Sequence, residues 1–245
     1  MKKRLDIAMV ERGLAASRTQ AQALVMEGKV RVAGQTEYKP SRQIDDAASV
    51  EVEAPPRFVS RGGEKLEGAF ALWGAAGLDA SGKTCLDVGS STGGFTDCLL
   101  QHGAARVMAV DVGTNQLAYS LRVDPRVWVR ENFNARFMKP SDLPETPSLA
   151  VTDVSFISLK LILPPIRDVL ADGGEIVALI KPQFEVGKGN APGGLVRDER
   201  LRIEARDGIV RFAEEELGLA LLGLAESPIK GREMGNVEYL SYWRK

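Results

Sequence analysis

The chain has 245 residues, of which 44% are hydrophobic and 27% charged, and its formal net charge is −1. This length suits one sizeable α/β domain together with a smaller one, because single domains usually hold roughly 100 to 200 residues. The balanced charge excludes a strong overall attraction to nucleic acid, so any such site must be a local patch. No stretch approaches the roughly 18 apolar residues of a membrane span. The apolar run near the start is too short for a signal peptide. We therefore expect a cytoplasmic protein with no membrane partner.

The residues that usually bind zinc are scarce: two cysteines, Cys85 and Cys98, and one histidine, His102. Nothing near the cysteines has the spacing of a metal site, and a single histidine is too few for a zinc site of the usual make-up. We expect buried thiols and no bound metal. His102 follows a predicted helix, where an imidazolium would interact favourably with the helix dipole.

The first elements in chain order form a compact α+β unit, predicted over 1–53. Two short amphipathic helices come first, one stopped by Gly13 and the next capped by Ser17. Strands that alternate valine with polar residues follow at 30–32 and 50–52. Its first 31 residues hold seven basic and three acidic side chains, an excess of four positive charges. A solvated surface would account for that excess, and so would a local patch for RNA.

The run RLDIAMVERGLAASRTQAQALVMEGKVRVAG, over 4–34, resembles the small RNA-binding domain first recognised in ribosomal protein S4. The resemblance implies that the second helix and the following hairpin lie against structured RNA. It makes Arg4, Arg18 and Lys29 the expected phosphate contacts. Such contacts position a protein on RNA without reading its sequence.

A linker is predicted over 54–60, where two prolines stiffen the chain, and the second domain is predicted over 61–245. The second domain opens with a helix over 65–76. The next eight residues, GLDASGKT, fit the phosphate-loop pattern letter for letter. A phosphate loop must follow a strand and open a helix, whereas this segment follows a helix and opens a strand. We therefore do not expect nucleotide hydrolysis.

Strands and helices alternate through the rest of the chain, which predicts a mostly parallel, doubly wound sheet of Rossmann-like α/β class. After the strand that begins at Thr84, the helices are expected near Gly94 and over 114–121, 157–170 and 198–217. The further strands are expected over 107–111, 127–129, 149–153, 175–180, 219–225 and 237–243.

The segment TCLDVGSSTGGF, over 84–95, is a short apolar strand that delivers a glycine-rich loop to the start of a helix. Open α/β sheets cradle cofactors in this way. A second apolar strand, VMAVD, ends in the carboxylate of Asp111. Dinucleotide-binding loops need G-x-G-x-x-G so that backbone amides meet a pyrophosphate. Here the second glycine of that pattern is missing.

The form aspartate-x-glycine-x-x-x-glycine instead resembles the loop of S-adenosylmethionine-dependent methyltransferases, whose cofactor has no phosphate. The resemblance implies that the loop passes beside the amino-acid part of the cofactor, and that Asp111 accepts hydrogen bonds from its ribose hydroxyls. The residues expected to bind the cofactor are Asp87, Gly89, Ser90, Thr92, Gly93, Gly94, Phe95, Asp111 and Val112.

Asp153 and Lys181 each end a predicted strand, Lys65 lies near the start of the second domain, and Glu238 lies in the final strand, so that the four could converge beside the cofactor in the order Lys65, Asp153, Lys181 and Glu238. This order resembles the catalytic tetrad of the FtsJ-type ribose 2'-O-methyltransferases. With the runs SRGGEKL, DVGSSTGGFTD, VTDVSFISL and KPQFE, nearly the whole chain is similar to the TlyA family of ribosomal RNA methyltransferases, members of which are often labelled haemolysins. The resemblance implies methylation of ribose 2'-hydroxyls of cytidine in ribosomal RNA within ribosomal subunits.

The four residue types also suit that reaction chemically. A ribose hydroxyl is a poor nucleophile, and displacement at a sulfonium methyl needs it deprotonated or nearly so. Lys181 is the natural base or anion stabiliser, Lys65 supplies a second cation, and Asp153 and Glu238 orient the two ammonium groups. Two other classes stay open: a non-catalytic RNA-binding or ribosome assembly factor, and a haemolysin-like membrane-active protein.

Overall fold

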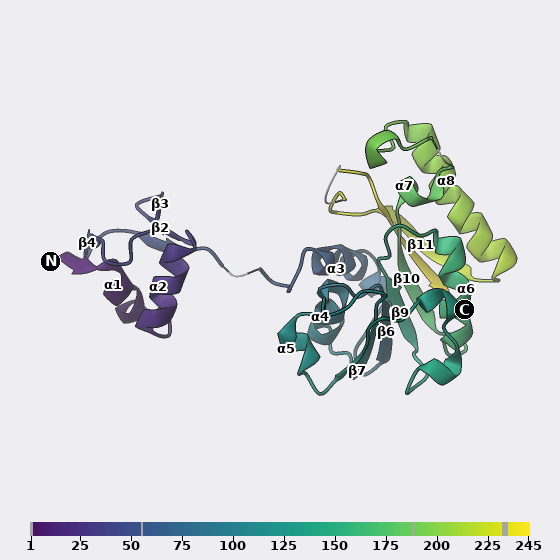
Figure 1. Ribbon diagram of the computed structural model, residues 1–245, viewed down its shortest axis with the longest axis horizontal. Helices are drawn as coiled ribbons and strands as arrows, with labels where there is room; N and C mark the ends of the chain where they lie inside the picture. Colours follow the sequence, from purple (N-terminus) through teal and green to yellow (C-terminus); the bar gives the residue numbers. More distant parts are fainter. Residues whose placement is uncertain (1, 55, 188, 232–234) are drawn as a thin grey trace. The chain divides into compact units, whose positions relative to one another are not determined.

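The computed structural model describes residues 2–54, 56–187, 189–231 and 235–245. The chain divides into two compact units, Met1–Arg57 and Phe58–Lys245 (Figure 1). Pro55, in the predicted linker, lies outside the described residues.

The first unit packs two helices and two small antiparallel sheets around one apolar core. Its elements are β1 (Lys2–Arg4), α1 (Leu5–Glu11), α2 (Arg18–Met26), β2 (Val30–Val32), β3 (Gln35–Glu37), β4 (Gln43–Asp45) and β5 (Val50–Val52). Strand β1 pairs with β4, and β2 lies between β3 and β5. The predicted cap is confirmed, because Ser17 Oγ accepts a hydrogen bond from Gln20 N at 3.2 Å. The short strands β1 and β4 were not predicted.

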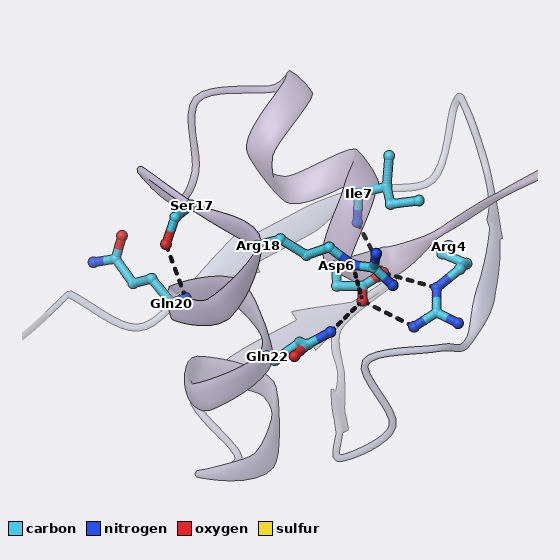
Figure 2. A network of polar contacts seen from close by, with 7 residues as sticks. All are labelled: Arg4, Asp6, Ile7, Ser17, Arg18, Gln20 and Gln22. Atoms are coloured by element: carbon cyan, nitrogen blue, oxygen red, sulfur yellow. Dashed lines mark hydrogen bonds and ion pairs between the residues drawn. The ribbon is translucent and has the colours of Figure 1, made fainter.

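A buried carboxylate, Asp6, holds the two helices of this unit together (Figure 2). It accepts hydrogen bonds from Arg4 Nη2 at 2.9 Å, from Arg18 Nε at 3.0 Å and from Gln22 Nε2 at 2.8 Å. The hydrogen bond from Arg4 is the main reason that the pKa of Asp6 lies well below its usual range, although burial alone would raise it. Two of the three predicted RNA contacts therefore also have a structural role inside the unit.

The second unit is built on one seven-stranded sheet. Its strands are β6 (Thr84–Val88), β7 (Arg106–Val110), β8 (Val127–Arg130), β9 (Leu149–Thr152), β10 (Glu175–Ile180), β11 (Ala220–Glu226) and β12 (Tyr239–Arg244). They lie in the order β11-β12-β10-β9-β6-β7-β8, and β12 runs antiparallel to both its neighbours. The order reverses between β6 and β9. In open α/β sheets the ligand crevice lies at such a switch point, outside the carboxyl ends of the strands.

Helices cover both faces of this sheet (Figure 1). They are α3 (Gly62–Trp73), α4 (Gly94–Gln101), α5 (Tyr119–Arg122), α6 (Leu163–Val169), α7 (Pro182–Glu185) and α8 (Glu199–Arg211). Apolar side chains of α3 and α4 pack on one face, and those of α6 and α8 on the other. Along β10 the buried residues belong alternately to the two cores, as the period-2 geometry of a strand requires. The predicted mostly parallel α/β fold is confirmed.

Two predicted helices are wrong in extent. The helix expected over 114–121 is only α5, because the carboxylates of Asp111 and Glu131 accept hydrogen bonds from the Gly113 and Gln116 amides and hold that segment in loops. The helix expected over 157–170 is a turn followed by α6, which begins one residue before its two prolines. Proline is tolerated only in the first turn of a helix. The longest predicted helix is confirmed as α8, which continues into one wide turn over Phe212–Glu216.

Candidate active site

The glycine loop after β6 is held tightly against the neighbouring strand ends. Gly89 N and Ser90 N both donate to Val110 O, at 2.9 and 3.2 Å. Gly89 and Gly93 have φ values of +82° and +98°, in the left-handed region that favours glycine. A Cβ on Gly93 would meet the Leu121 side chain at 2.3 Å, and one on Gly89 would meet Val154 at 3.0 Å. The loop therefore needs glycine at both positions for conformation and for space.

Asp111 lies at the end of β7 and faces this loop. Its carboxylate accepts hydrogen bonds from Ser91 N at 2.8 Å and from Gly113 N at 2.6 Å. The next residue, Val112, is 73% exposed. Each carboxylate oxygen has a second acceptor position, so Asp111 retains capacity for a ligand with hydroxyl groups.

The other predicted cofactor residues lie at different depths around the loop. Gly94 begins α4, where a Cβ would lie 2.7 Å from Gly63 N, so this glycine permits close packing of α3 on α4. Phe95 and Ser90 are buried, and the Phe95 side chain belongs to the core beneath the loop. Thr92 is exposed at the loop surface.

Asp87 is fully buried beneath the loop. Its Oδ2 accepts a hydrogen bond from Thr96 Oγ1 at 2.7 Å. Its Oδ1 has no hydrogen-bond partner among the described residues. Burial raises the pKa of Asp87 to about 7, although the Thr96 hydrogen bond lowers it. An orphaned acceptor at this depth marks a point to which a ligand or a water can donate.

The raised pKa of Asp87 predicts a pH dependence of folding. The pKa of Asp87 is higher in the folded protein, about 7, than in the unfolded chain, 3.8. Its contribution to the stability of the fold is therefore fully present below pH 3.8 and is lost as the pH rises through the folded-state pKa. The free energy of unfolding should therefore fall between about pH 4 and pH 7, by up to about 1.4 kcal/mol per pH unit from this group. Urea denaturation of the Asp87→Asn variant should show a correspondingly flatter pH profile. Equal pH slopes in both proteins would contradict the assignment.

The four predicted catalytic residues meet at the carboxyl edge of the sheet. Lys65 Nζ, from the first turns of α3, lies 2.7 Å from Glu238 Oε2 and 3.4 Å from Asp153 Oδ2. Lys181 Nζ, just after β10, lies 2.5 Å from Asp153 Oδ1. Asp153 follows β9, and Glu238 precedes β12. The structure thus brings together four residues that are up to 173 positions apart in the chain.

This cluster is largely shielded from water, and Asp153 is its most exposed member. The side chains of Glu238, Lys181 and Lys65 are 3%, 9% and 12% exposed, and that of Asp153 is 19% exposed. Two ammonium and two carboxylate groups balance their charges, which is how buried charges are normally tolerated. A small substrate group that reaches Asp153 would therefore meet both lysines in a partly dry environment.

Two neighbours of the cluster were not predicted as site residues. Lys181 Nζ donates to Ser155 Oγ at 2.8 Å, which fixes the ammonium from a second direction. Phe156 is 88% exposed and has φ of +63°, a strained conformation for a bulky residue. Its ring lies 5.2 Å from that of Phe184 in α7. Backbone strain could not be read from the sequence, although the motif DVSF marked the position of both residues.

The predicted RNA contacts lie in the first unit. Arg4 and Arg18 keep 35% and 54% of their side-chain surface exposed despite the ion pairs with Asp6. Lys29 Nζ lies 2.6 Å from Glu27 Oε2 and is 41% exposed. All three side chains remain exposed enough to contact a phosphate group.

Comparisons with known proteins identify the family of each unit. Residues 58–245 match the FtsJ-like methyltransferase family, and residues 3–49 match the S4 domain. The chain is 46% identical to the 16S/23S rRNA (cytidine-2'-O)-methyltransferase TlyA of Mycobacterium tuberculosis, over 98% of this chain and 89% of that protein. It is 43% identical to Hemolysin A of Brachyspira hyodysenteriae, over 98% and 99%. A solved structure of a hemolysin-type protein from Streptococcus thermophilus superposes with a TM-score of 0.75 at 43% identity, over 100% of this chain and 88% of that one.

The match over the whole second unit makes this chain a member of the FtsJ-like methyltransferases, a class that uses S-adenosylmethionine. Within that class, the preceding S4 domain and the near full-length identities place it in the TlyA family. Among the described residues, no helix is both long and apolar enough to cross a membrane.

Proposed function

We propose that this protein transfers a methyl group from S-adenosylmethionine to the 2'-hydroxyl of cytidine in ribosomal RNA. The observation that carries the proposal is the cluster of Lys65, Asp153, Lys181 and Glu238 at the sheet edge beside the glycine loop. The Mycobacterium tuberculosis relative, a 16S/23S rRNA (cytidine-2'-O)-methyltransferase, supports the same reaction, substrate and target nucleoside.

The residues around the loop fit a cofactor with an amino acid, a ribose and no phosphate. The left-handed conformation of Gly89 and Gly93 lets the loop pack closely against Val154 and Leu121. No basic side chain that would bind a phosphate is among the nine predicted cofactor residues. In the proposed complex Asp111 would hold the ribose hydroxyls, and the loop above the buried Asp87 would receive the amino-acid part. When bound, S-adenosylmethionine supplies a sulfonium methyl group that is open to direct displacement.

The chain's own residues activate the attacking oxygen. Lys181, aligned by Asp153 and Ser155, faces the 2'-hydroxyl as base or anion stabiliser. The oxygen would give its proton to a neutral amine of Lys181 acting as base, or to solvent if Lys181 only stabilises the anion, as the new carbon–oxygen bond forms and the carbon–sulfur bond breaks. Lys65 adds positive charge beside the developing anion, and Glu238 fixes Lys65 at 2.7 Å. Holding the oxygen, the methyl carbon and the sulfur in line lowers the barrier further, because the entropy of orienting the reactants is then lost on binding and not during the reaction.

The two domains have separate roles in this proposal. Residues 1–53 dock on folded ribosomal RNA, with phosphates near Arg4, Arg18 and Lys29. The segment 54–60 is the linker, and residues 61–245 carry out the transfer. The S4 match over residues 3–49 supports RNA binding by the first domain.

The function can be tested with purified ribosomal subunits, labelled S-adenosylmethionine and the full chain. The RNA is then digested to nucleosides and separated by chromatography. We expect the label in 2'-O-methylcytidine. Label in a modified base, or in ribosomal protein, would overturn the proposal.

Calorimetry separates this enzyme from the two other classes considered above. A methyltransferase binds S-adenosylmethionine in the absence of RNA, whereas a pure assembly factor has no reason to do so. Absence of binding would favour the assembly factor. The haemolysin-like alternative predicts leakage from lipid vesicles that does not depend on the cofactor.

Phe156 is expected to stack on a base next to the reacting ribose. Phe156 has a strained backbone conformation and an exposed ring, and it follows Asp153 of the cluster by three residues. Such a ring could stack on a base that has been flipped out of the RNA helix. Phe156→Ala should lower kcat/KM roughly 10- to 100-fold, because stacking of a base on an aromatic ring contributes about 1–3 kcal/mol. Phe156→Trp should keep most of the activity. Phe137→Ala, at another exposed phenylalanine, is the matched control, and equal losses in both alanine variants would argue against stacking.

A further inference from the structure

A group of side chains of the types that bind metal ions lies between α3 and α4, outside the cluster described above. Cys98 and His102 are one turn apart at the end of α4, and Glu67 comes from α3. His102 Nε2 lies 2.7 Å from Glu67 Oε2, and Cys98 Sγ lies 3.9 Å from the same oxygen. One sulfur, one nitrogen and one oxygen donor thus lie within 4.8 Å of one another. Sequence spacing did not reveal this group, because the third donor comes from another helix.

We propose that Glu67, Cys98 and His102 bind a divalent transition metal ion of the zinc type, with water at a fourth position. Zinc binds thiolate sulfur at about 2.3 Å and nitrogen or oxygen at about 2.0–2.2 Å in a tetrahedron, so its donors lie roughly 3.5 Å apart. The observed spacing needs side-chain shifts of only about 1 Å to reach that geometry. Magnesium and calcium prefer sets of oxygen ligands, which this group does not offer.

The donors are held in place and remain accessible. The His102 ring stacks on Phe70 with centroids 3.9 Å apart and planes 14° apart, which fixes the direction of Nε2. Cys98 is fully buried, whereas the side chains of His102 and Glu67 are 28% and 27% exposed. Glu67 and His102 are therefore accessible to an ion from solvent, and Cys98 Sγ lies 3.9 Å behind the same Glu67 oxygen.

A simpler explanation of the same residues is an ion pair between Glu67 and His102 above a buried thiol. That explanation needs no contribution from the sulfur, whereas the metal site requires it. Binding would release the thiol proton of Cys98 to solvent, because the thiolate is the ligand. The bound ion would cross-link α3, which carries Lys65 two residues before Glu67, to α4, which begins at the glycine loop. We assign it a stabilising role in holding these two helices together.

Cobalt is the probe for the test, because a thiolate bound to Co²⁺ gives a charge-transfer absorption in the near ultraviolet. Full-length protein is freed of metal with a chelator and titrated with Co²⁺, then with Zn²⁺. We expect the absorption at one equivalent of Co²⁺ and its loss when Zn²⁺ is added. The Cys85→Ala variant should keep the absorption, and Cys98→Ala should lose it.

Two milder variants keep the proposal testable if the Cys98 variant does not fold. Glu67→Gln and His102→Gln change partly exposed side chains and leave the thiol in place. Each should weaken Co²⁺ binding at least about tenfold. Zn²⁺ should raise the unfolding temperature of the wild-type protein, and Mg²⁺ should not. Absence of the absorption, its persistence in Cys98→Ala, or unchanged affinity in both glutamine variants would overturn the proposal.

Discussion

Replacing Lys181 by alanine is expected to lower kcat for methylation of ribosomal subunits about 100- to 10,000-fold, the range typical of general acid–base catalysis. Lys181 is the group whose ammonium is aligned by both Asp153 and Ser155, and its side chain is 9% exposed. Water cannot replace it easily at that position. The affinity for S-adenosylmethionine should stay unchanged in calorimetry, because the cofactor residues lie around another loop.

Two further variants sharpen this test. Lys245→Ala removes a lysine at the opposite edge of the sheet, after β12, and should leave kcat unchanged. Lys181→Arg keeps the positive charge but stays protonated. If Lys181 acts as the base, the arginine variant will be as inactive as the alanine variant; if it stabilises an anion, part of the activity will remain. Full activity in Lys181→Ala would show that the cluster does not carry the reaction.

Deleting residues 1–53 is expected to abolish methylation of intact ribosomal subunits while leaving cofactor binding intact. Once the first domain is bound to ribosomal RNA, binding of the methyltransferase domain to its target is intramolecular. Such a linkage raises the overall affinity about 100- to 10,000-fold. The loss should therefore appear chiefly as a higher KM. The second unit has its own core on both faces of its sheet, which supports its folding without the first domain.

The deletion is checked by three measurements on the same preparation. Far-ultraviolet circular dichroism verifies folding, calorimetry with S-adenosylmethionine verifies the cofactor site, and label transfer to ribosomal subunits reports activity. Unchanged turnover at low subunit concentration would refute the docking role. Loss of cofactor binding would show instead that the first domain supports the methyltransferase site.

The elements predicted best were those whose signals are local in the sequence. Ser17 was identified as a cap from its position before an apolar period, and the loop after Thr84 from its glycines. Asp153 and Lys181 could be placed at one edge because the carboxyl ends of parallel strands meet there. Lys65 in α3 and Glu238 before the antiparallel β12 were assigned from the resemblance to the FtsJ-type tetrad.

The features that were missed depend on contacts between distant segments. Strands β1 and β4 are three residues each, and only their pairing across some 40 residues defines them. The helix expected over 114–121 was shortened by carboxylates of Asp111 and Glu131, which come from outside it. Likewise, Glu67 meets Cys98 and His102 only because α3 packs on α4. Helical periodicity carries no information about such partners.

The most direct test of the central claim is alkaline hydrolysis of ribosomal RNA after incubation with the wild-type protein and S-adenosylmethionine. A 2'-O-methyl group blocks attack of the ribose oxygen on the neighbouring phosphate. We predict a gap in the hydrolysis ladder at a cytidine, present with the wild-type protein and absent with Lys181→Ala. A continuous ladder from RNA that has nevertheless taken up the methyl label would contradict methylation of the ribose.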